Sequence, residues 1–243
     1  MSGVSFPRSG ILDLRQYTLR PGRRDDLIDL FDTHFVAGQE DAGMHIVGQF
    51  RDLDDPDRFV WLRAYDSWTA RGAALPAFYY GPVWQANRDR ANATLVDSDD
   101  ALLLRPVRLG PGCPRYGTPR GDGADPASVV GITVVYRDRP VDDEFCELVL
   151  GGVAPVLADT GGGAVAVLVT DPSPNNFPAL PLREEDAVVW INRFDDDEAY
   201  ERHRAELDQS AAWRDELLPA LLQTAKLPMQ QMRLRPTAAS QLR

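Results

Sequence analysis

The first hundred residues alternate between strand-like and helix-like patterns of apolar positions. Apolar and polar residues alternate from 11 to 20, as in a half-buried strand, and from 23 to 38 the apolar residues recur at helical spacing. This order predicts a β-α-β-β-α-β unit, the ferredoxin-like plan, with helices on one face of a four-stranded sheet. The remaining elements are predicted as strands at 44–51, 59–65 and 102–104, with helices at 68–75 and 83–94.

The same plan repeats in the second half of the chain. The interval from Trp61 to Trp84 recurs between Trp190 and Trp213, and each half ends on an apolar strand that closes with Arg-Pro. A repeated unit of this size indicates a duplication. Its elements are predicted as strands at 130–136, 164–170, 187–194 and 229–234, with helices at 142–157 and 198–225.

We therefore predict an α+β fold built from two tandem duplicated ferredoxin-like domains. The first covers residues 1–109 and the second, more diverged, covers 128–243, with a linker rich in Gly and Pro at 110–127. A sheet with helices on one face must also cover its other face. The two sheets are expected to do this by packing face to face.

Alternation along the strands separates the residues that face the partner sheet from those that face the helices. On the third strand, Val60, Leu62 and Ala64 are expected to point toward the helices. Large aromatic and polar residues would then face the other sheet. A ligand pocket is therefore expected between the two sheets, and the first half is its better-equipped wall.

Charge and cysteine content narrow the range of partners and compartments. The formal net charge of −11 repels phosphate backbones and anionic lipid surfaces, so neither nucleic acid nor membrane is an expected partner. No apolar run reaches the ~18 residues of a membrane span. Cys113 and Cys146 lack metal-site or redox-motif spacing, which suits a reducing compartment and predicts a cytoplasmic protein.

Known catalytic motifs are absent from the sequence. The three histidines are spread through the chain and form no zinc set, and no phosphate-binding loop, dinucleotide fingerprint or nucleophile elbow is found. No cofactor is predicted. Any catalysis would come from ordinary side chains in a pocket, and the candidates are, for catalysis, His45, Arg63 and Arg15, and for ligand binding, Asp13, Tyr17, Gln49, Trp61, Tyr65, Tyr79 and Trp84.

Each candidate also has a structural interpretation. Arg63 with Asp13 is equally explained as a structural ion pair, because a buried arginine requires a partner. His45 is more often a hydrogen-bonded core or rim residue than a catalyst. The tryptophans at duplicated spacing are explained by packing, and Tyr79 belongs either to a pocket lid or to a hinge between helices.

Several segments of the first half together resemble one bacterial protein family. The strings Leu12 to Gly22, Gly48 to Arg51, Phe59 to Arg63, Phe78 to Trp84 and Leu102 to Pro106 look like those of the NIPSNAP family, over roughly residues 11–107. The second half resembles this family weakly. The resemblance implies the dimeric α+β barrel superfamily, which includes cofactor-independent monooxygenases, isomerases, dehydratases and haem enzymes, and it implies no catalytic set.

Three functions are left open by the sequence. The first is a small-molecule protein that binds an apolar or aromatic metabolite in the barrel and catalyses a cofactor-independent oxygenation, isomerisation, cyclisation or dehydration. Arg15 and Arg63 would then hold an anionic or carbonyl oxygen, and His45 would move a proton. The second is a non-catalytic binding or assembly protein whose barrel is filled by its own side chains. The third is a haem protein, which requires a histidine inside the barrel, and assembly into a homo-oligomer is left open throughout.

Overall fold

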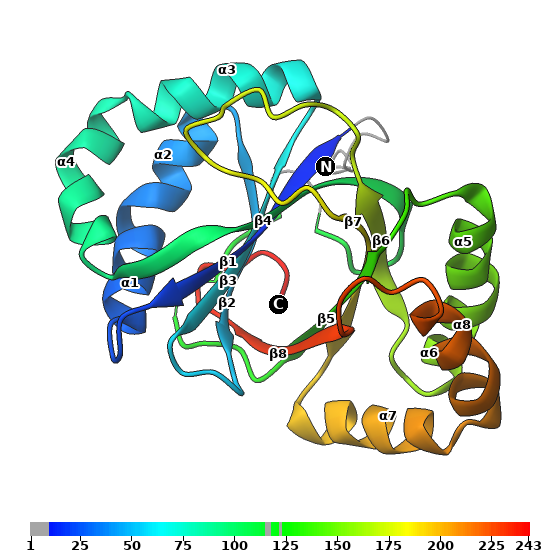
Figure 1. The fold of residues 1–243 in the computed structure, drawn as a ribbon. Coiled ribbons are helices and arrows are strands. Elements are labelled where there is room, and N and C mark those ends of the chain that lie inside the picture. The colour runs from blue at the N-terminus through cyan, green and yellow to red at the C-terminus, as the bar shows by residue number, and fades with distance from the viewer. Residues whose placement is uncertain (1–9, 115–117, 122) are drawn as a thin grey trace.

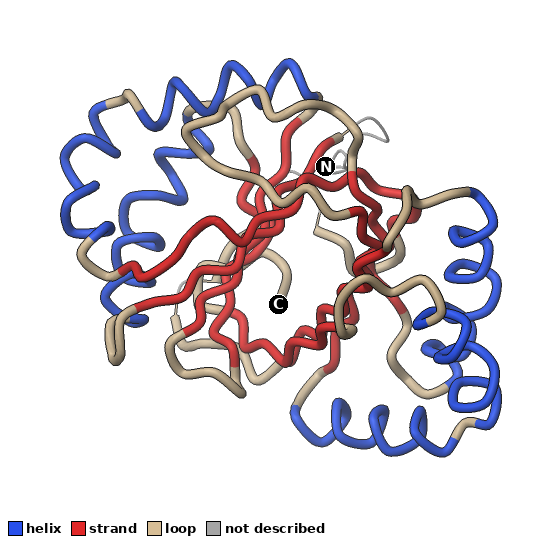
Figure 2. Tube along the Cα trace, in the orientation of Figure 1, coloured by secondary structure: helices blue, strands red, loops and turns tan. Residues whose placement is uncertain are grey.

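Eight antiparallel strands form one closed barrel in the computed structural model, which describes residues 10–114, 118–121 and 123–243. The order around the barrel is β1-β3-β2-β8-β5-β7-β6-β4. Helices lie on the outside, with α1 to α4 against the strands of the first half and α5 to α8 against those of the second (Figures 1 and 2). The linker predicted at 110–127 includes residues 115–117 and 122, which lie outside the described part of the chain.

The elements of the first half follow the predicted order. One predicted helix is a continuous run whose middle is a π-helical turn, and α4 starts at a proline, which suits a first helical position. The fourth strand is much longer than predicted. The elements are β1 (Ile11–Leu19), α1 (Arg24–Leu30), η1 (Phe31–Phe35), α2 (Val36–Asp41), β2 (His45–Asp52), β3 (Arg58–Tyr65), α3 (Trp68–Tyr79), α4 (Pro82–Asn92) and β4 (Leu95–Leu109).

The second half has the same succession of elements. Asp142 and Asp196 cap the first turns of α5 and α7 by accepting backbone N–H groups, as short polar residues do at helix starts. Its elements are β5 (Val129–Arg137), α5 (Asp143–Glu147), η2 (Leu148–Val153), α6 (Ala154–Asp159), β6 (Ala164–Thr170), β7 (Asp186–Phe194), α7 (Asp197–Gln209), η3 (Ala212–Leu217), α8 (Leu218–Leu222) and β8 (Gln230–Pro236).

Each half contributes four neighbouring strands in the same relative order. These are β4-β1-β3-β2 in the first half and β8-β5-β7-β6 in the second. The halves join where β2 pairs with β8 and where β4 pairs with β6. This edge pairing closes the barrel, so neither four-stranded segment keeps a free edge that could pair with another chain.

The strand faces are the reverse of the predicted assignment. Val60, Leu62 and Ala64 belong to the core inside the barrel, together with aliphatic residues of the second half. Phe59, Trp61 and Tyr65 pack instead against the helices. Both faces of these strands are buried, so alternation separates two sets of residues without showing which set faces which layer. Mostly aliphatic side chains, together with Phe50 and Tyr136, fill the barrel, whereas most of the aromatic residues of the first half lie in the helix layer.

A long loop connects β6 and β7. Residues 171–185, here called the 171–185 loop, leave the second half and extend over the first half toward α3, as the yellow segment of Figure 1 shows. Backbone hydrogen bonds tie both ends of the loop to β4, from Asp171 N to Leu103 O (2.9 Å) and from Arg183 N to Ala101 O (2.8 Å). The loop therefore packs against the first half, although it belongs to the second half in sequence.

No helix in the described part of the chain is long and apolar enough to cross a membrane.

Candidate functional site

A cavity of about 430 Å³ lies between the strands and the helices of the first half. It is of the size that small ligands occupy. Its floor comes from β1 and β3, its sides from the helices and the start of β4, and one wall from the 171–185 loop. The lining residues are mostly aromatic or apolar: Tyr17, Leu27, Phe31, Phe35, Gln39, Trp61, Phe78, Tyr79, Tyr80, Trp84, Gln85, Arg88, Ala91, Asn92, Leu95, Ser98, Phe177, Ala179 and Leu180.

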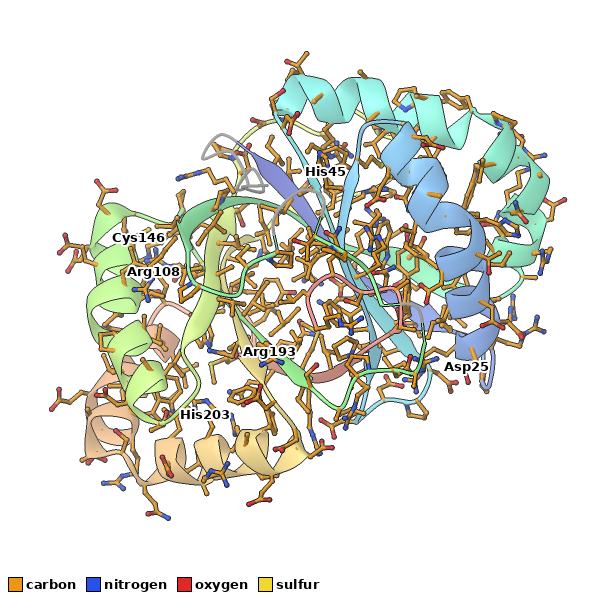
Figure 3. The ribbon with its side chains drawn as sticks, turned by 180° about the vertical axis from the view of Figure 1, so that it is seen from behind. Asp25, His45, Arg108, Cys146, Arg193 and His203 are labelled. Carbon is orange, nitrogen blue, oxygen red and sulfur yellow. The ribbon has the colours of Figure 1, made fainter. Side chains whose placement is uncertain are left out.

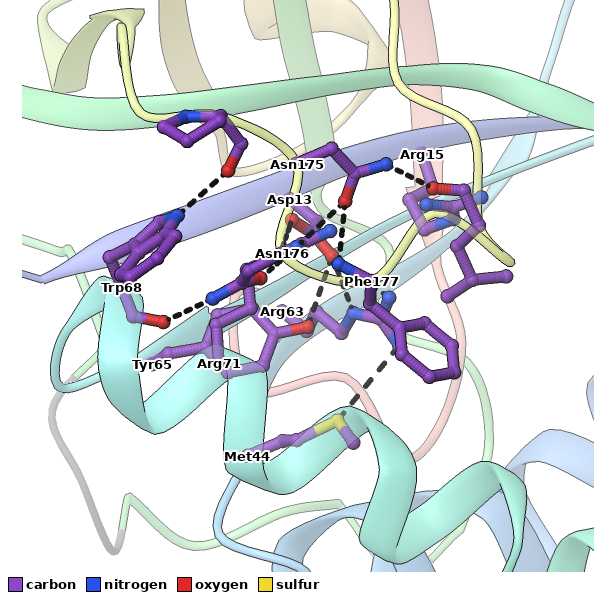
Figure 4. A network of polar contacts seen from close by, with 12 residues as sticks. Asp13, Arg15, Met44, Arg63, Tyr65, Trp68, Arg71, Asn175, Asn176 and Phe177 are labelled. Carbon is purple, nitrogen blue, oxygen red and sulfur yellow. Dashed lines mark hydrogen bonds and ion pairs between the residues drawn. The ribbon is translucent and has the colours of Figure 1, made fainter.

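A buried ion cluster lies on the same face of the sheet as the cavity floor. Asp13 is fully buried, and its Oδ2 accepts hydrogen bonds from Arg63 Nε (2.8 Å) and from the Tyr65 hydroxyl (3.0 Å). Its Oδ1 accepts one from Arg71 Nε (3.1 Å). Figure 4 shows this carboxylate between the two guanidinium groups. Because Asp13 and Arg63 are directly paired across β1 and β3, the strand register itself brings them together.

Arg63 connects this cluster to the cavity. Its Nη1 donates to Gln39 Oε1 (3.0 Å) and to the Tyr79 hydroxyl (3.4 Å), and both partners line the cavity. Its Cζ lies 4.9 Å from the centre of the Trp61 ring, a cation–π contact. The guanidinium group therefore contacts three side chains that line the cavity, two through hydrogen bonds and one through its ring face.

Arg15 and Trp61 are the second directly paired residues on this face. Arg15 Nη2 donates to Ser98 O (2.8 Å) and Arg15 Nε to the Tyr17 hydroxyl (3.3 Å), and both of these residues line the cavity. Arg15 Nη1 and Trp61 Nε1 are buried and have no hydrogen-bond partner among the described residues. A buried donor without an acceptor is costly, so each such atom in a folded protein requires an explanation.

The buried charges of this region do not balance. Arg15, Arg63 and Arg71 are fully buried, and Asp13 is the single carboxylate within the cluster, which leaves a net charge of +2. Arginine does not lose its proton in proteins, so the excess cannot disappear by titration. Although burial by itself would raise the pKa of Asp13, the guanidinium groups of Arg63 and Arg71 hold it below its usual value. Burial raises the pKa of Tyr17, so its hydroxyl stays protonated.

Most of the predicted site residues meet around this cavity. Tyr17, Trp61, Tyr79 and Trp84 line it, whereas five others lie in the buried shell on the same face of the sheet. Gln49 belongs to that shell because it pairs with Trp61, although its amide points to Asp32 Oδ1 (3.3 Å). The shell residues are Asp13, Arg15, Gln49, Arg63 and Tyr65.

His45 lies on the other face of the sheet. It pairs with Ala64, whose side chain belongs to the core inside the barrel, and its Nε2 is 3.8 Å from Asp66 Oδ1. Burial lowers the pKa of His45. Its role as a proton carrier stays a prediction, and the site proposed below does not include it. None of the three histidines, all within the described residues, lines the cavity, and Figure 3 shows His45 and His203 in different halves.

Sequence reasoning missed the contribution of the 171–185 loop. Arg71 Nη1 donates to Asn175 Oδ1 (3.2 Å) and to Asn176 Oδ1 (2.7 Å), and Phe177 lines the cavity. The segment contains four prolines, which are typical of a loop, but nothing in the sequence indicates which half the loop covers. Arg71 lies in a helix, and the sequence does not indicate that its charged side chain is buried. No group of three or more metal-ligating side chains is found among the described residues.

Comparison with solved structures identifies the fold. A protein of Fusobacterium nucleatum that is provisionally assigned as a monooxygenase is 10% identical, with 98% of this chain and 94% of that chain covered and a TM-score of 0.57. A protein of Lactobacillus acidophilus with the same provisional assignment is 14% identical, with 96% and 97% covered and a TM-score of 0.54. An anthrone oxidase-like protein is 14% identical, with 97% and 94% covered and a TM-score of 0.63.

Fold and cavity together define a class of protein: an antiparallel α+β barrel with a cavity under the helices of its first half. The NIPSNAP family model matches residues 12–111, so this chain carries a NIPSNAP domain, as the sequence resemblance indicated. No curated protein sequence matches the chain. The three structural neighbours are too distant in sequence to show more than a shared fold.

Proposed function

We propose that this chain binds a small aromatic metabolite with an anionic or carbonyl oxygen in the cavity under the helices of its NIPSNAP domain. The observation that carries the proposal is a buried net positive charge beside an aromatic cavity, where Arg15 Nη1 and Trp61 Nε1 have no acceptor within the described part of the chain. A buried charge is tolerated when it is paired, and a ligand oxygen would supply the missing pair. The cavity differs from the predicted one in lying outside the barrel.

The side chains around the cavity take distinct roles in this proposal. Arg15 and Trp61 donate hydrogen bonds to the ligand oxygen. Arg63 adds positive charge and holds Tyr79 in place, and Asp13 keeps Arg63 oriented. The aromatic wall, which includes Trp84, packs against the rings of the ligand.

Such a site would also favour a cofactor-independent reaction. Fixed cationic donors stabilise an oxyanion as it develops, and an aromatic alcohol or ketone held this way loses a proton more readily. The resulting electron-rich ring can react with O₂ directly. For anthrone, the methylene carbon would lose two hydrogens, one oxygen atom of O₂ would become its new carbonyl oxygen, and the other would leave as water. The names of the three structural neighbours support an oxygenation over the other predicted reactions.

Two measurements test binding and catalysis separately. Isothermal titration calorimetry with 1-naphthoate and with neutral 1-naphthamide tests the charge: the acid is expected to bind at least tenfold more tightly. Equal affinities, or no binding of either, would contradict the proposed site. Oxygen uptake with anthrone tests catalysis, with the Arg15→Met variant as the matched control for spontaneous oxidation.

The alternative function is non-catalytic binding. The packed aliphatic core inside the barrel matches the filled barrel of that hypothesis, although the cavity lies elsewhere. Tight binding of 1-naphthoate without any anthrone oxidation would favour it. Haem binding has less support, because no histidine lines the cavity.

We also infer that residues 1–109 and 128–243 are two copies of a duplicated ferredoxin-like unit, joined by residues 110–127. The identical relative order of four strands in each half supports this origin. Two unpaired cysteines, Cys113 and Cys146, are in keeping with function in the cytoplasm. Expression of 1–109 alone tests the unit: a duplicated module is expected to form a dimer that replaces the missing edge partners.

A further inference from the structure

The 171–185 loop brings side chains of the second half to the cavity of the first. Phe177 is 6% exposed and belongs to the apolar core under the helices of the first half. Its ring stacks on that of Tyr79, with centroids 5.8 Å apart and 24° between the planes. Phe177, Ala179 and Leu180 all line the cavity. The NIPSNAP domain therefore does not enclose this cavity by itself.

Hydrogen bonds fix the shape of the loop around Phe177. Asn175 Nδ2 donates to Leu180 O (2.8 Å), and Phe177 N donates to Asn175 Oδ1 (3.0 Å). Leu180 N donates to Phe177 O (3.0 Å). Four prolines further restrict the backbone, which lowers the entropy that ordering the loop costs. The ring of Phe177 is thus presented by a pre-organised turn.

A second set of contacts holds the turn against α3. The guanidinium group of Arg71 donates to both Asn175 and Asn176, Asn176 Nδ2 donates to Trp68 O (2.7 Å), and Trp68 Nε1 donates to Pro174 O (2.8 Å). Figure 4 shows these contacts from α3 to the loop. Arg71 also binds Asp13, so the charged cluster beneath the cavity and the loop beside it share one side chain.

Glycine at position 72 allows this close approach. A Cβ atom there would lie 2.7 Å from Asn176 Nδ2, well inside van der Waals contact. The Asn176 amide would have to shift, which disturbs its hydrogen bond to Trp68 O. Because Gly72 has an ordinary helical conformation, alanine would otherwise favour the helix by about 1 kcal/mol. A substitution of Gly72 by alanine therefore weakens the docking of the loop without destabilising the helix.

We propose that the 171–185 loop determines which ligands the cavity accepts, with Phe177 setting the upper limit on ring size and the Arg71 contacts setting the position of Phe177. This inference rests on the proposed function and deepens it. Removing the ring of Phe177 lengthens the cavity toward the loop, so larger planar ligands gain space while small ones lose an apolar contact. Gly72→Ala displaces the whole turn and so enlarges the cavity on the same side, without removing any aromatic ring.

The test is a ligand series of increasing size. Dissociation constants of benzoate, 1-naphthoate and anthracene-9-carboxylate are measured by calorimetry for the native chain, Phe177→Ala and Gly72→Ala. Both variants are expected to bind the three-ring acid better relative to the two-ring acid. For Phe177→Ala the ratio of the two dissociation constants is expected to change at least tenfold. The exposed residue Glu184 of the same loop supplies the control, and Glu184→Gln is expected to leave the preference unchanged.

A second measurement needs no ligand. Trp61 and Trp84 line the cavity, so acrylamide quenching of tryptophan fluorescence reports access to it. Both variants are expected to be quenched more strongly than the native chain and Glu184→Gln. If the native chain binds none of the acids, the proposed function fails, and the quenching alone then decides the role of the loop. Unchanged size preference, or unchanged quenching where no acid binds, overturns the inference about the loop.

Discussion

The two halves of the barrel can be compared position by position, because each has a tryptophan at the same place in the strand register. Arg15 pairs with Trp61 across β1 and β3, and Thr133 pairs with Trp190 across β5 and β7. Both pairs face the helix layer. In the first half the partner of the tryptophan is a buried cation, one of whose N–H groups has no acceptor among the residues that the structure describes. In the second half the partner is a small hydroxyl.

The neighbouring register position differs in the same sense. Asp13 and Arg63 form a buried ion pair in the first half, whereas Gly131 and Asn192 occupy the equivalent places in the second. Gly131 has no side chain, and the rings of Phe194 and Tyr200 lie next to it. Asn192 donates to a backbone carbonyl, Gly162 O, rather than to a charged group. No charge remains on that face at these positions.

The space beneath the helices differs accordingly. The cavity of the first half measures about 430 Å³, and the corresponding space of the second half, around Trp190 and His203, measures about 20 Å³. Aliphatic side chains and Trp213 fill the second helix layer. The comparison shows that one strand order supports either a filled core or a charged cavity, and that the side chains at a few register positions decide between them.

The largest expected effect concerns the buried carboxylate. Asp13→Asn leaves Arg63 and Arg71 buried without a counter-charge and is expected to lower the free energy of unfolding by about 3–5 kcal/mol. Asp197→Asn is the matched control, since Asp197 also contacts two arginines, Arg233 and Arg235, but is 45% exposed. There the loss is expected to stay below about 1 kcal/mol. Denaturant unfolding measures both, and equal losses would show that burial is not decisive.

The next effect concerns ligand affinity. Arg15→Met removes the cation that has an unpaired donor and is expected to weaken 1-naphthoate binding at least tenfold. The free energy of unfolding should change much less than in Asp13→Asn, because replacing a buried cation by an apolar chain removes its desolvation cost. Thr133→Val, at the equivalent position of the second half, should leave binding unchanged. Calorimetry with both variants decides, and an equal affinity for native and Arg15→Met would remove Arg15 from the site.

A smaller effect is expected for the indole N–H. Trp61→Phe keeps an aromatic ring and loses one donor, whose net value is about 0.5–1.5 kcal/mol, or roughly a two- to tenfold loss of 1-naphthoate affinity. Trp190→Phe removes the same atoms from the second half. Both variants should lose similar stability by thermal unfolding, but only the first should lose affinity. Similar affinities for the two variants would mean that Trp61 serves packing alone.

The smallest effect is a pH dependence from one histidine in each half. Burial lowers the pKa of both His45 and His203, so the folded state binds protons less readily than the unfolded state. Between the folded pKa and about 6.5, the unfolded state holds more protons, and stability rises with pH. Acidification from pH 7 should therefore lower the free energy of unfolding until both sites are protonated. His203→Gln and His45→Gln should each flatten this slope in denaturant titrations at pH 5 to 7, and an unchanged slope in both would contradict the assigned cause.

Part of the site could be found from the sequence because the alternation of side chains along each strand is a local property. The alternation of β1 and β3 put Asp13, Arg15, Trp61 and Arg63 on one face, and the structure keeps them together. The chain could not show which layer that face meets, because both faces of each strand are buried. His45 was expected on the same face as Arg15 and Arg63, but a register shift in β2 between Ile46 and Gly48 places it on the opposite face, beside Ala64.

The amino-acid sequence by itself determined the succession of strands and helices, the repetition of that plan, and the family to which residues 12–111 are related. These depend on local periodicity and on residue identity. The tertiary structure decided that aliphatic side chains fill the barrel, that the cavity lies under the helices, and that Phe177 from the second half forms one of its walls. These features arise from contacts between residues far apart in the chain, and no local pattern encodes them.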